Sequence, residues 1–305
     1  MLSRLRESIA RRARPFRRGA AFFWREYGLP ESRPRGHDYS PLPDTEAGAA
    51  IAERAAARNP LSGLPGIRLD PGAQRRMLME MTGLGAEFDW PHAPTDARRY
   101  YTGQNWFPAA DAFVLYALLQ LMKPKRVIEV GSGYSSALML DAREFKLRPQ
   151  PALTFIDPSP ERLRSLLRPG DVASATVHAA ALQDVPQEIF GELEAGDFLF
   201  VDSSHVSKVG SEVHTILFEI VPALAPGVIV HFHDVFWPFE YPAKWIRSGV
   251  AWNESYLLRA FLMFNSAFEV LFWGPYAAAM VPDAAAALGK FRLKESASLW
   301  LRRAR

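Results

Sequence analysis

The chain of 305 residues contains no cysteine. This absence excludes disulfide bonds, metal sites with thiolate ligands and catalysis by a cysteine nucleophile. It fits a reducing compartment, and we expect a cytoplasmic protein. No apolar run reaches the roughly 18 residues that a membrane-spanning helix needs. With 49% hydrophobic and 23% charged residues, the composition is typical of a globular protein that buries its core without disulfides or structural metal.

Acidic residues are scarce at the start of the chain. Residues 1–35 hold ten arginines and three glutamates, a net charge of +7, whereas the remaining 270 residues carry 26 basic and 30 acidic side chains, a net charge of −4. A weakly acidic core lacks the broad basic footprint of a nucleic-acid-binding protein, so we expect no nucleic-acid partner. Arginines interrupt any signal-peptide-like apolar segment, although an arginine-rich start also resembles a transit peptide.

The first hundred residues are predicted to be an extension of the core. Residues 1–27 are expected to form a basic helix, broken or kinked at Pro15. It is interpreted either as a helix lying on an anionic membrane surface or as a solvated or packed arm; the irregular apolar stripe favours the arm. Residues 28–72 are rich in proline and glycine and predict a linker around one helix near Thr45–Arg58. We therefore treat residues 1–100 as a basic arm, linker and helical extension.

From Arg126 onward, short apolar runs alternate with helical stretches. The runs predict strands at Arg126–Val130, Leu153–Ile156, Ala175–His178, Phe198–Val201 and Val228–Phe232. Nearly continuous apolar strands that alternate with helices indicate a parallel sheet covered on both faces. Right-handed crossovers then give a doubly wound, Rossmann-like α/β fold with a mostly parallel sheet.

The pattern is weaker on either side of these strands. Helices are expected at Gln74–Gly85, at Phe107–Met122 and near Glu254–Phe264, followed by a strand at Phe268–Phe272. We also expect a last strand at Ala278–Val281 and a short helix at Leu299–Arg305. The predicted division is a core over residues 101–282 and a C-terminal tail over residues 283–305.

A glycine-rich loop, EVGSGYSS at residues 129–136, follows the first predicted strand. Glycines allow a tight turn and close approach to a ligand, and the helix that begins near Ser135 presents free N–H groups. The second strand leads to Asp157, 24 residues beyond Gly133, where a carboxylate can accept hydrogen bonds from ribose hydroxyls. Together these features predict a site for an adenosine-containing cofactor; the alternative is an ordinary α/β turn.

The loop favours a positively charged cofactor over a dinucleotide. The carboxylate of Glu129 would repel a pyrophosphate, and it suits a ligand that carries an ammonium and a sulfonium group. Ser136 stands where the dinucleotide-binding loop needs a small residue, usually glycine or alanine. An NAD-dependent oxidoreductase is therefore the less favoured alternative.

Acidic residues and histidines follow two of the core strands. Asp202 and Asp234 each end a strand, with His205 three residues past the first and His233 directly before the second. Oxygen and imidazole donors that converge in this way can bind a divalent cation or supply a general base. Strand-end caps and structural histidines are the alternatives. His231 lies deeper in its strand and is expected to be structural.

Several motifs resemble class I S-adenosylmethionine-dependent methyltransferases. VIEVGSGYSS is similar to their first motif and FIDPSPERL to their second. HAAALQDVPQEIFGEL, DFLFVDSSH and LAPGVIVHFHD resemble the third to fifth strands of the catechol O-methyltransferase family. Over about Tyr101–Trp273 the chain most resembles the bacterial methyltransferase 24 group. This resemblance implies S-adenosylmethionine as the cofactor and O-methylation of a small-molecule or sugar hydroxyl as the activity.

The resemblance also assigns residues. It implies a cofactor site with Glu129, Gly131, Gly133 and Ser135 near the methionine part, Asp157 at the ribose and Gln183 by the adenine. Asp202 and Asp234 match metal-binding carboxylates, which implies Mg²⁺, but Val235 occupies the position of the third ligand. His205 matches a basic side chain, and we expect it to be the general base, with His233 as the alternative.

Substrate and assembly are less determined by the sequence. Aromatic residues at 235–242 and at 100–106 are expected to shape an acceptor pocket or, equally, to form a satellite core under a loop. A non-catalytic cofactor-binding module and a metal hydrolase are further alternatives. No pattern indicates an oligomeric state.

Overall fold

The computed structural model describes residues 34–58 and 63–304. The predicted basic arm over residues 1–27 lies outside these ranges, and its two interpretations stay predictions. Within the described residues, no helix combines the length and the apolar character needed to cross a membrane.

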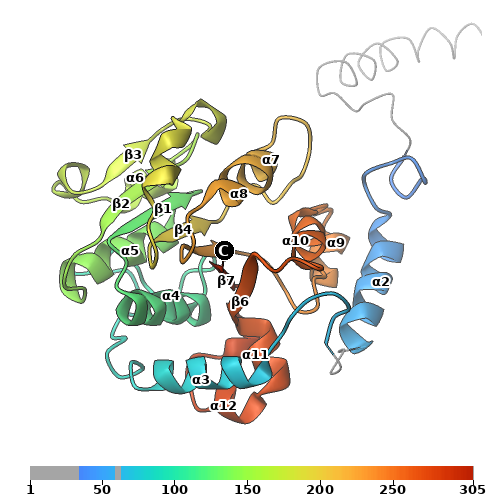
Figure 1. Cartoon of the computed structure of the whole chain (residues 1–305), viewed down its shortest axis with the longest axis horizontal. Helices are drawn as coiled ribbons and strands as arrows, with labels where there is room; N and C mark the ends of the chain where they lie inside the picture. The colour runs from blue at the N-terminus through green and yellow to red at the C-terminus, as the bar shows by residue number, and fades with distance from the viewer. Residues whose placement is uncertain (1–33, 59–62, 305) are drawn as a thin grey trace, which may run out of the picture.

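A seven-stranded sheet forms the centre of the structure (Figure 1). Its order is β3-β2-β1-β4-β5-β7-β6. Strands β1 to β5 pair in parallel, and β7 runs antiparallel to both β5 and β6. The bounds are β1 Arg126–Val130, β2 Ala152–Ile156, β3 Thr176–His178, β4 Phe198–Val201, β5 Ile229–Phe232, β6 Phe268–Trp273 and β7 Leu299–Arg303. The predicted mostly parallel, Rossmann-like sheet is confirmed.

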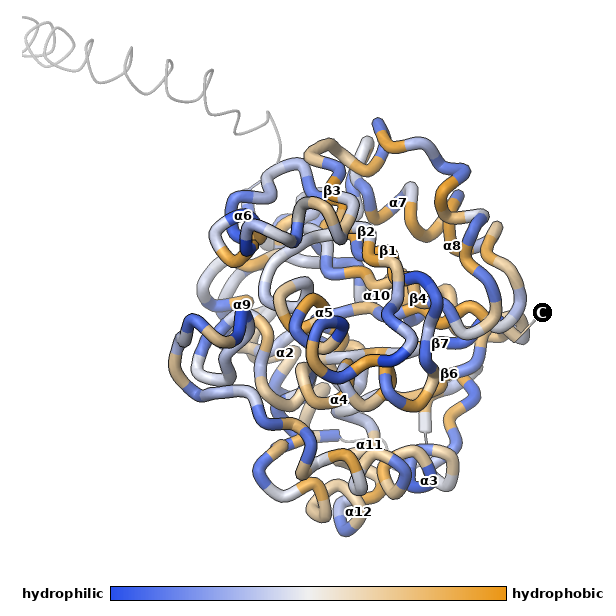
Figure 2. Tube along the Cα trace, turned by 90° about the vertical axis from the view of Figure 1, so that its left-hand side faces the viewer, coloured by the Kyte–Doolittle hydropathy of each residue, from blue (hydrophilic) through white to orange (hydrophobic). Residues whose placement is uncertain are grey.

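Helical segments connect the strands and cover both faces. Before and within the parallel part they are α2 Thr45–Arg58, α3 Pro71–Thr82, α4 Ala109–Met122, α5 Tyr134–Phe145, α6 Glu161–Leu166, η1 Asp171–Ala173, η2 Leu182–Asp184 and η3 Gln187–Glu192. Later come α7 Glu212–Thr215, the π turn η4 Ile216–Ile220, α8 Val221–Ala223, α9 Ala243–Arg247, α10 Glu254–Leu262, α11 Gly274–Met280, α12 Pro282–Ala286 and η5 Leu293–Glu295. In both views α3 lies beside α11 and α12 at one end of the molecule (Figures 1 and 2).

Strand β1 shows why both faces must be covered. Val127 packs into one apolar cluster with Phe113 of α4 and Leu138 of α5. Its neighbour Ile128 packs into a second cluster with Ile216 of the π turn. Because successive side chains of a strand point to opposite faces, an apolar run such as this needs helices on each side.

The last part of the chain differs from the prediction. The expected strand at Ala278–Val281 is helix α11, and the expected helix at Leu299–Arg305 is strand β7. Strand β7 lies between β5 and β6, and Trp300 is fully buried. A strand that is buried on both faces has no alternating pattern, so three apolar residues in a row do not distinguish it from a helix. The segment predicted as a tail therefore contains a strand of the sheet.

A buried ion network joins the N-terminal extension to the core. The guanidinium of Arg99 is 4% exposed, and its Nη1 lies 2.9 Å from Oδ1 of Asp141 on α5. Its Nε donates to Oδ2 of Asp171 at 2.8 Å. Asp141 also accepts a hydrogen bond from Nε1 of Trp90 at 3.0 Å. Arg99 is thus a counter-ion that two buried carboxylates share.

We predict that Arg99→Leu lowers the free energy of unfolding by about 3–5 kcal/mol, because it leaves the carboxylates of Asp141 and Asp171 buried without the cation that they share. Urea denaturation followed by circular dichroism measures this loss. The matched control is Lys125→Leu, since Lys125 pairs with Glu194 at the exposed surface and is expected to contribute less than about 1 kcal/mol. Equal losses in the two variants would contradict the assignment.

Candidate active site

A cavity of about 480 Å³ opens at the carboxyl edge of the sheet. It lies where the strand order reverses between β1 and β4, the place at which doubly wound sheets bind ligands. The predicted residues that line it are Gly131, Gly133, Ser135, Asp157, Gln183, Asp202, His205, His233 and Asp234. The loop after β1 and the ends of β4 and β5 therefore face one common space, of a size usual for a small-molecule site.

Only glycine fits at position 131, the first glycine of the loop. Gly131 has a φ of +83°, and a Cβ there would lie 1.7 Å from the carbonyl oxygen of Asp202. The loop after β1 thus touches the backbone that follows β4. Gly133 has a φ of 170°, which any residue adopts, and a Cβ there would meet Cδ of the Arg162 side chain at 3.1 Å. The close approach of the loop to the backbone of Asp202 therefore requires glycine at position 131 and not at position 133.

Glu129 is not among the residues that line the cavity. Its side chain is fully buried under the loop, where it accepts hydrogen bonds from the hydroxyls of Ser135 and Ser136 at the start of α5. Ser136 also accepts a hydrogen bond from the N–H of Gly133 at 2.9 Å. Burial raises the pKa of Glu129 to about 8, although the two serine hydroxyls oppose this shift. Glu129 thus supports the loop from below, and its contact with a cofactor stays a prediction.

Asp157 holds the loop and still faces the cavity. Its Oδ2 accepts hydrogen bonds from the N–H and the hydroxyl of Ser132, at 2.9 and 2.7 Å. Its Oδ1 accepts one from the N–H of Ser159 at 2.8 Å. Gln183 of η2 is exposed at the cavity wall and donates to the carbonyl of Gly210 at 2.8 Å. The two residues assigned to ribose and adenine therefore share the cavity with Gly131.

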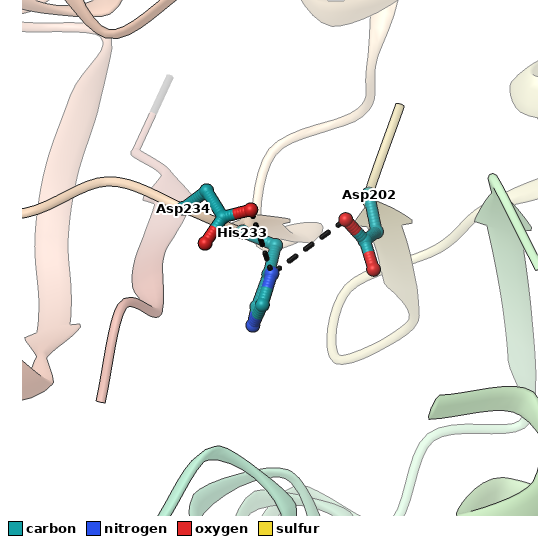
Figure 3. Close-up of side chains that lie close together, drawn as sticks. All are labelled: Asp202, His233 and Asp234. Atoms are coloured by element: carbon teal, nitrogen blue, oxygen red, sulfur yellow. Dashed lines mark ion pairs between the residues drawn. The ribbon is translucent and has the colours of Figure 1, made fainter. Parts of the chain in front are cut away.

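Two aspartates and two histidines lie together in the part of the cavity next to the ends of β4 and β5. Asp202 follows β4 and Asp234 follows β5, which are hydrogen-bonded neighbours. Nδ1 of His233 lies 3.6 Å from an oxygen of each aspartate (Figure 3). Nε2 of His205 lies 3.5 Å from the same two oxygens. His205 and Asp234 both have positive φ, at 59° and 56°, a strained backbone that persists only where the surroundings hold it.

In each of these histidines, the ring nitrogen that points away from Asp202 and Asp234 faces a buried carboxylate. Neither of these carboxylates was predicted from the sequence. Nδ1 of His205 is bonded to Oε2 of Glu254 on α10 at 2.9 Å. Nε2 of His233 lies 3.5 Å from Oδ2 of Asp111 on α4. Asp111 in turn accepts a hydrogen bond from the hydroxyl of Ser298 at 2.6 Å. For Asp111, the available signal was the one acidic residue in a mostly apolar helix, AADAFVLYALLQLM.

The carboxylates stabilise protonated histidines. Burial opposes the charged form of His205, but Asp202 and Glu254 outweigh it and raise its pKa to about 10. Burial likewise opposes the charge on His233, and Asp202, Asp234 and Asp111 raise its pKa well above the ordinary range. Burial would raise the pKa of Asp202, yet His233 and His205 lower it. Because an imidazolium has no free lone pair, His205 acts as a base only after its proton has been displaced.

His231 does not line the cavity, although its ring lies 5.8 Å from that of His233. It is fully buried, stacks on Phe200 with a centroid distance of 3.8 Å, and its Nε2 lies 3.0 Å from the hydroxyl of Ser298. Burial lowers its pKa well below the ordinary value. Its position agrees with the structural role that the sequence predicts.

The aromatic loop at residues 235–242 packs away from the cavity. Phe239 and Trp237 pack against Trp273, at centroid distances of 4.5 and 5.1 Å. Phe239 thereby joins the main apolar cluster on one face of the sheet, whereas Phe236 and Tyr241 belong to a smaller cluster, so only part of the loop matches the second of its two interpretations. Trp106 and Trp252 line the cavity instead. Trp106 carries the guanidinium of Arg162 over its ring at 3.6 Å, and Trp252 packs against His205 at 4.5 Å.

The oxygen ligands that the resemblance implies for Mg²⁺ are only partly present in this donor set. Asp202, His233 and Asp234 each present a ligand atom, and these atoms lie within 4.8 Å of one another. Mg²⁺ prefers oxygen ligands in an octahedral arrangement. Here the third oxygen ligand implied by the resemblance is replaced by Val235, which is 1% exposed, and two imidazole nitrogens face the aspartates.

Comparison with known proteins finds a match for the part of the chain that holds the glycine loop and the strands up to β5. Residues 128–235 match a family described as a methyltransferase domain, from β1 to just beyond β5. An uncharacterized protein of Archaeoglobus fulgidus is 27% identical to this chain over 165 residues, which cover 53% of this chain and 73% of that protein.

Two solved structures that match the chain are distant from it in sequence. A SAH-bound methyltransferase of Podospora anserina is 15% identical; the alignment covers 87% of this chain and 98% of that one, with a TM-score of 0.44. An O-methyltransferase of Streptomyces achromogenes in complex with SAM is 16% identical; the alignment covers 87% of this chain and 100% of that one, with a TM-score of 0.39.

The buried carboxyl of Glu129 predicts that the stability of the fold depends on pH. An unfolded glutamate titrates near its ordinary value of about 4.5, whereas in the fold the pKa is about 8. Between these values the folded state holds a proton that the unfolded state has lost, so the free energy of unfolding falls as the pH rises. We expect Glu129→Gln to remove this fall and to gain about 1–3 kcal/mol on the wild type between pH 5 and pH 8.

Urea denaturation at pH 5 and pH 8 measures the difference. Glu192→Gln is the control, because Glu192 is exposed and its replacement is expected to leave the pH profile unchanged. A Glu129→Gln profile parallel to that of the wild type would show that the carboxyl is ionised throughout.

Proposed function

We propose that this chain is an S-adenosylmethionine-dependent methyltransferase that transfers the methyl group to a hydroxyl of a small molecule or sugar. The observation that carries the proposal is the single cavity in which Gly131, Asp157 and Gln183 share a wall with Asp202 and Asp234. A cofactor held by the first three residues would have its far end beside the two aspartates.

The loop supports this cofactor over a dinucleotide. Ser136 is fully buried, and its hydroxyl is engaged by Glu129 and by the N–H of Gly133. A dinucleotide loop uses a small residue here so that helix and strand can pack closely. A ligand that carries an ammonium and a sulfonium group would favour the ionised form of the buried Glu129 carboxyl beneath the loop, whereas a pyrophosphate would favour its protonated form.

The other part of the cavity has the chemistry that an acceptor hydroxyl needs. Methyl transfer requires the hydroxyl to approach the methyl group in line with the sulfur and to lose its proton. The side chains of Asp202 and Asp234 are 29% and 15% exposed, so both reach the cavity. Trp106 and Trp252 offer flat apolar walls that suit a phenol or a sugar ring.

Binding of the cofactor is the first test. We expect calorimetry to show binding of S-adenosylmethionine and of its demethylated product, and no binding of NAD. Asp157→Ala removes a predicted ribose acceptor and should weaken binding by about 1–3 kcal/mol. Glu188→Ala, an exposed residue of η3, is the control. Tight binding of NAD without a response to S-adenosylmethionine would refute the proposal.

Turnover tests the roles of the acidic and histidine residues. We expect His205→Ala and Asp234→Asn each to lower the rate by about a hundredfold or more while cofactor binding is retained. The assay measures release of the demethylated product with phenolic and sugar acceptors. If His205→Ala keeps the full rate and His233→Ala does not, the role of proton acceptor moves to His233.

Location and assembly rest on charge and composition alone. We propose that the protein works in the cytoplasm, and that the arginine-rich residues 1–27 allow peripheral contact with an anionic membrane. The proposed catalytic residues and cofactor residues do not depend on either point.

A further inference from the structure

One guanidinium faces the cavity without an ionic partner. Among the described residues that line the cavity, Arg162 of α6 is the one lysine or arginine. Four carboxylates also line it, those of Asp157, Asp202, Glu212 and Asp234. Within the described part of the chain, no carboxylate is paired with Arg162. Its neighbour on the same helix, Arg164, lies 3.9 Å from Glu161. The charge of Arg162 is therefore available to an anion that enters the cavity.

The ring of Trp106 supports this guanidinium. Cζ of Arg162 lies 3.6 Å from the centroid of the Trp106 ring. A guanidinium over an indole face at this distance is attracted by the π electrons of the ring. Stacking occupies the face of the guanidinium and leaves the N–H groups at its edge free to donate. Trp106 is 62% exposed and adds little to the core, so its position is explained by the arginine that it carries.

The guanidinium lies beside the glycine loop. A Cβ added at Gly133 would lie 3.1 Å from Cδ of Arg162 and 3.8 Å from its Nη1. Burial and the hydroxyl of Tyr101 raise the pKa of Tyr134 to about 12, whereas the charge of Arg162 lowers it. The positive charge thus acts at the start of α5, next to the loop at which we propose that the cofactor binds.

We infer that Arg162, supported by Trp106, binds a carboxylate group of a ligand at the loop end of the cavity. Arginine binds a carboxylate through two parallel N–H···O hydrogen bonds. The four carboxylates that line the cavity disfavour a ligand with several negative charges, such as a phosphate ester, so a single carboxylate is the anion that fits.

This inference rests on the proposed function, whose ligands offer two sources of the carboxylate. One is the amino-acid end of S-adenosylmethionine. The other is an acceptor that carries an acid group besides its hydroxyl. From either source, Arg162 determines specificity, because it favours a ligand with a carboxylate over the same ligand without one.

Calorimetry with paired nucleosides tests the cofactor as the source. S-adenosylhomocysteine, the demethylated product, has the carboxylate, and 5′-methylthioadenosine lacks the whole amino-acid end. We expect Arg162→Met to weaken binding of S-adenosylhomocysteine about 10–100-fold and to change that of 5′-methylthioadenosine less than about twofold, because only the first carries an anion. The difference between the two ligands separates this contact from a general effect on the fold.

A second pair of probes tests the acceptor as the source. 4-Hydroxybenzoate and phenol differ by one carboxylate, and each is titrated into the protein saturated with S-adenosylhomocysteine. If the acceptor supplies the carboxylate, Arg162→Met removes a preference for 4-hydroxybenzoate over phenol and leaves the affinities for both nucleosides unchanged.

Further variants separate a binding role from a structural one. Arg162→Lys keeps the charge but loses the planar fork, and it should retain more affinity for the carboxylated probe than Arg162→Met does. Trp106→Leu should weaken that affinity about two- to fivefold, because it removes the ring under the guanidinium. Arg164→Met is the control on the same helix, since Arg164 is exposed and does not line the cavity. Circular dichroism checks that each variant is folded.

The inference is overturned if Arg162→Met changes neither the preference for S-adenosylhomocysteine over 5′-methylthioadenosine nor that for 4-hydroxybenzoate over phenol. Arg162 would then only cover the ring of Trp106. A different result refutes the proposed function: wild-type protein that binds neither nucleoside has no such cofactor, and the inference fails with it. Binding of both nucleosides with unchanged ratios in Arg162→Met would leave the proposed cofactor in place and remove only the role of Arg162.

Discussion

Two carboxylates at the ends of adjacent parallel strands need compensating charge, because carboxylates at a partly buried site repel each other and lose hydration. Asp202 and Asp234 are brought together by the pairing of β4 with β5, and His205 and His233 supply the opposite charge. These imidazoles are themselves buried and draw two more acidic groups from α10 and α4. The pairing of β4 with β5 thus leads to a network of alternating negative and positive side chains that extends to Glu254 on α10 and Asp111 on α4.

The glycine loop belongs to the same arrangement. Gly131 passes so close to the carbonyl of Asp202 that a side chain cannot be accommodated. The loop after β1 and the turn after β4 are therefore packed together, and a change at one is expected to displace the other. Glu129 adds a second constraint from below, since its carboxyl is bonded to the first turn of α5. A cofactor would bind to a preformed surface on a rigid element, which is how sites of high precision are usually built.

Segments distant in sequence supply much of the support. Helix α4 precedes the sheet, yet its Asp111 lies behind His233 and is bonded to Ser298 just before β7. The extension that precedes α4 is joined to α5 through Arg99. The proposed active site is therefore formed by the core strands but held by elements on both sides of the matched methyltransferase domain.

The sequence by itself determined the five parallel strands, the glycine loop and the pairs Asp202–His205 and His233–Asp234 at strand ends. These features depend on local patterns: apolar runs of strand length, glycines after a strand, and the rule that parallel strands share a carboxyl edge. The tertiary structure alone decided the place of β7, the buried position of Glu129, and the roles of Asp111 and Glu254. Each of these depends on contacts between residues far apart in the chain, such as 49 positions for His205 and Glu254. No local periodicity records such a contact, because a side chain's partner across the fold leaves no mark on its neighbours in sequence.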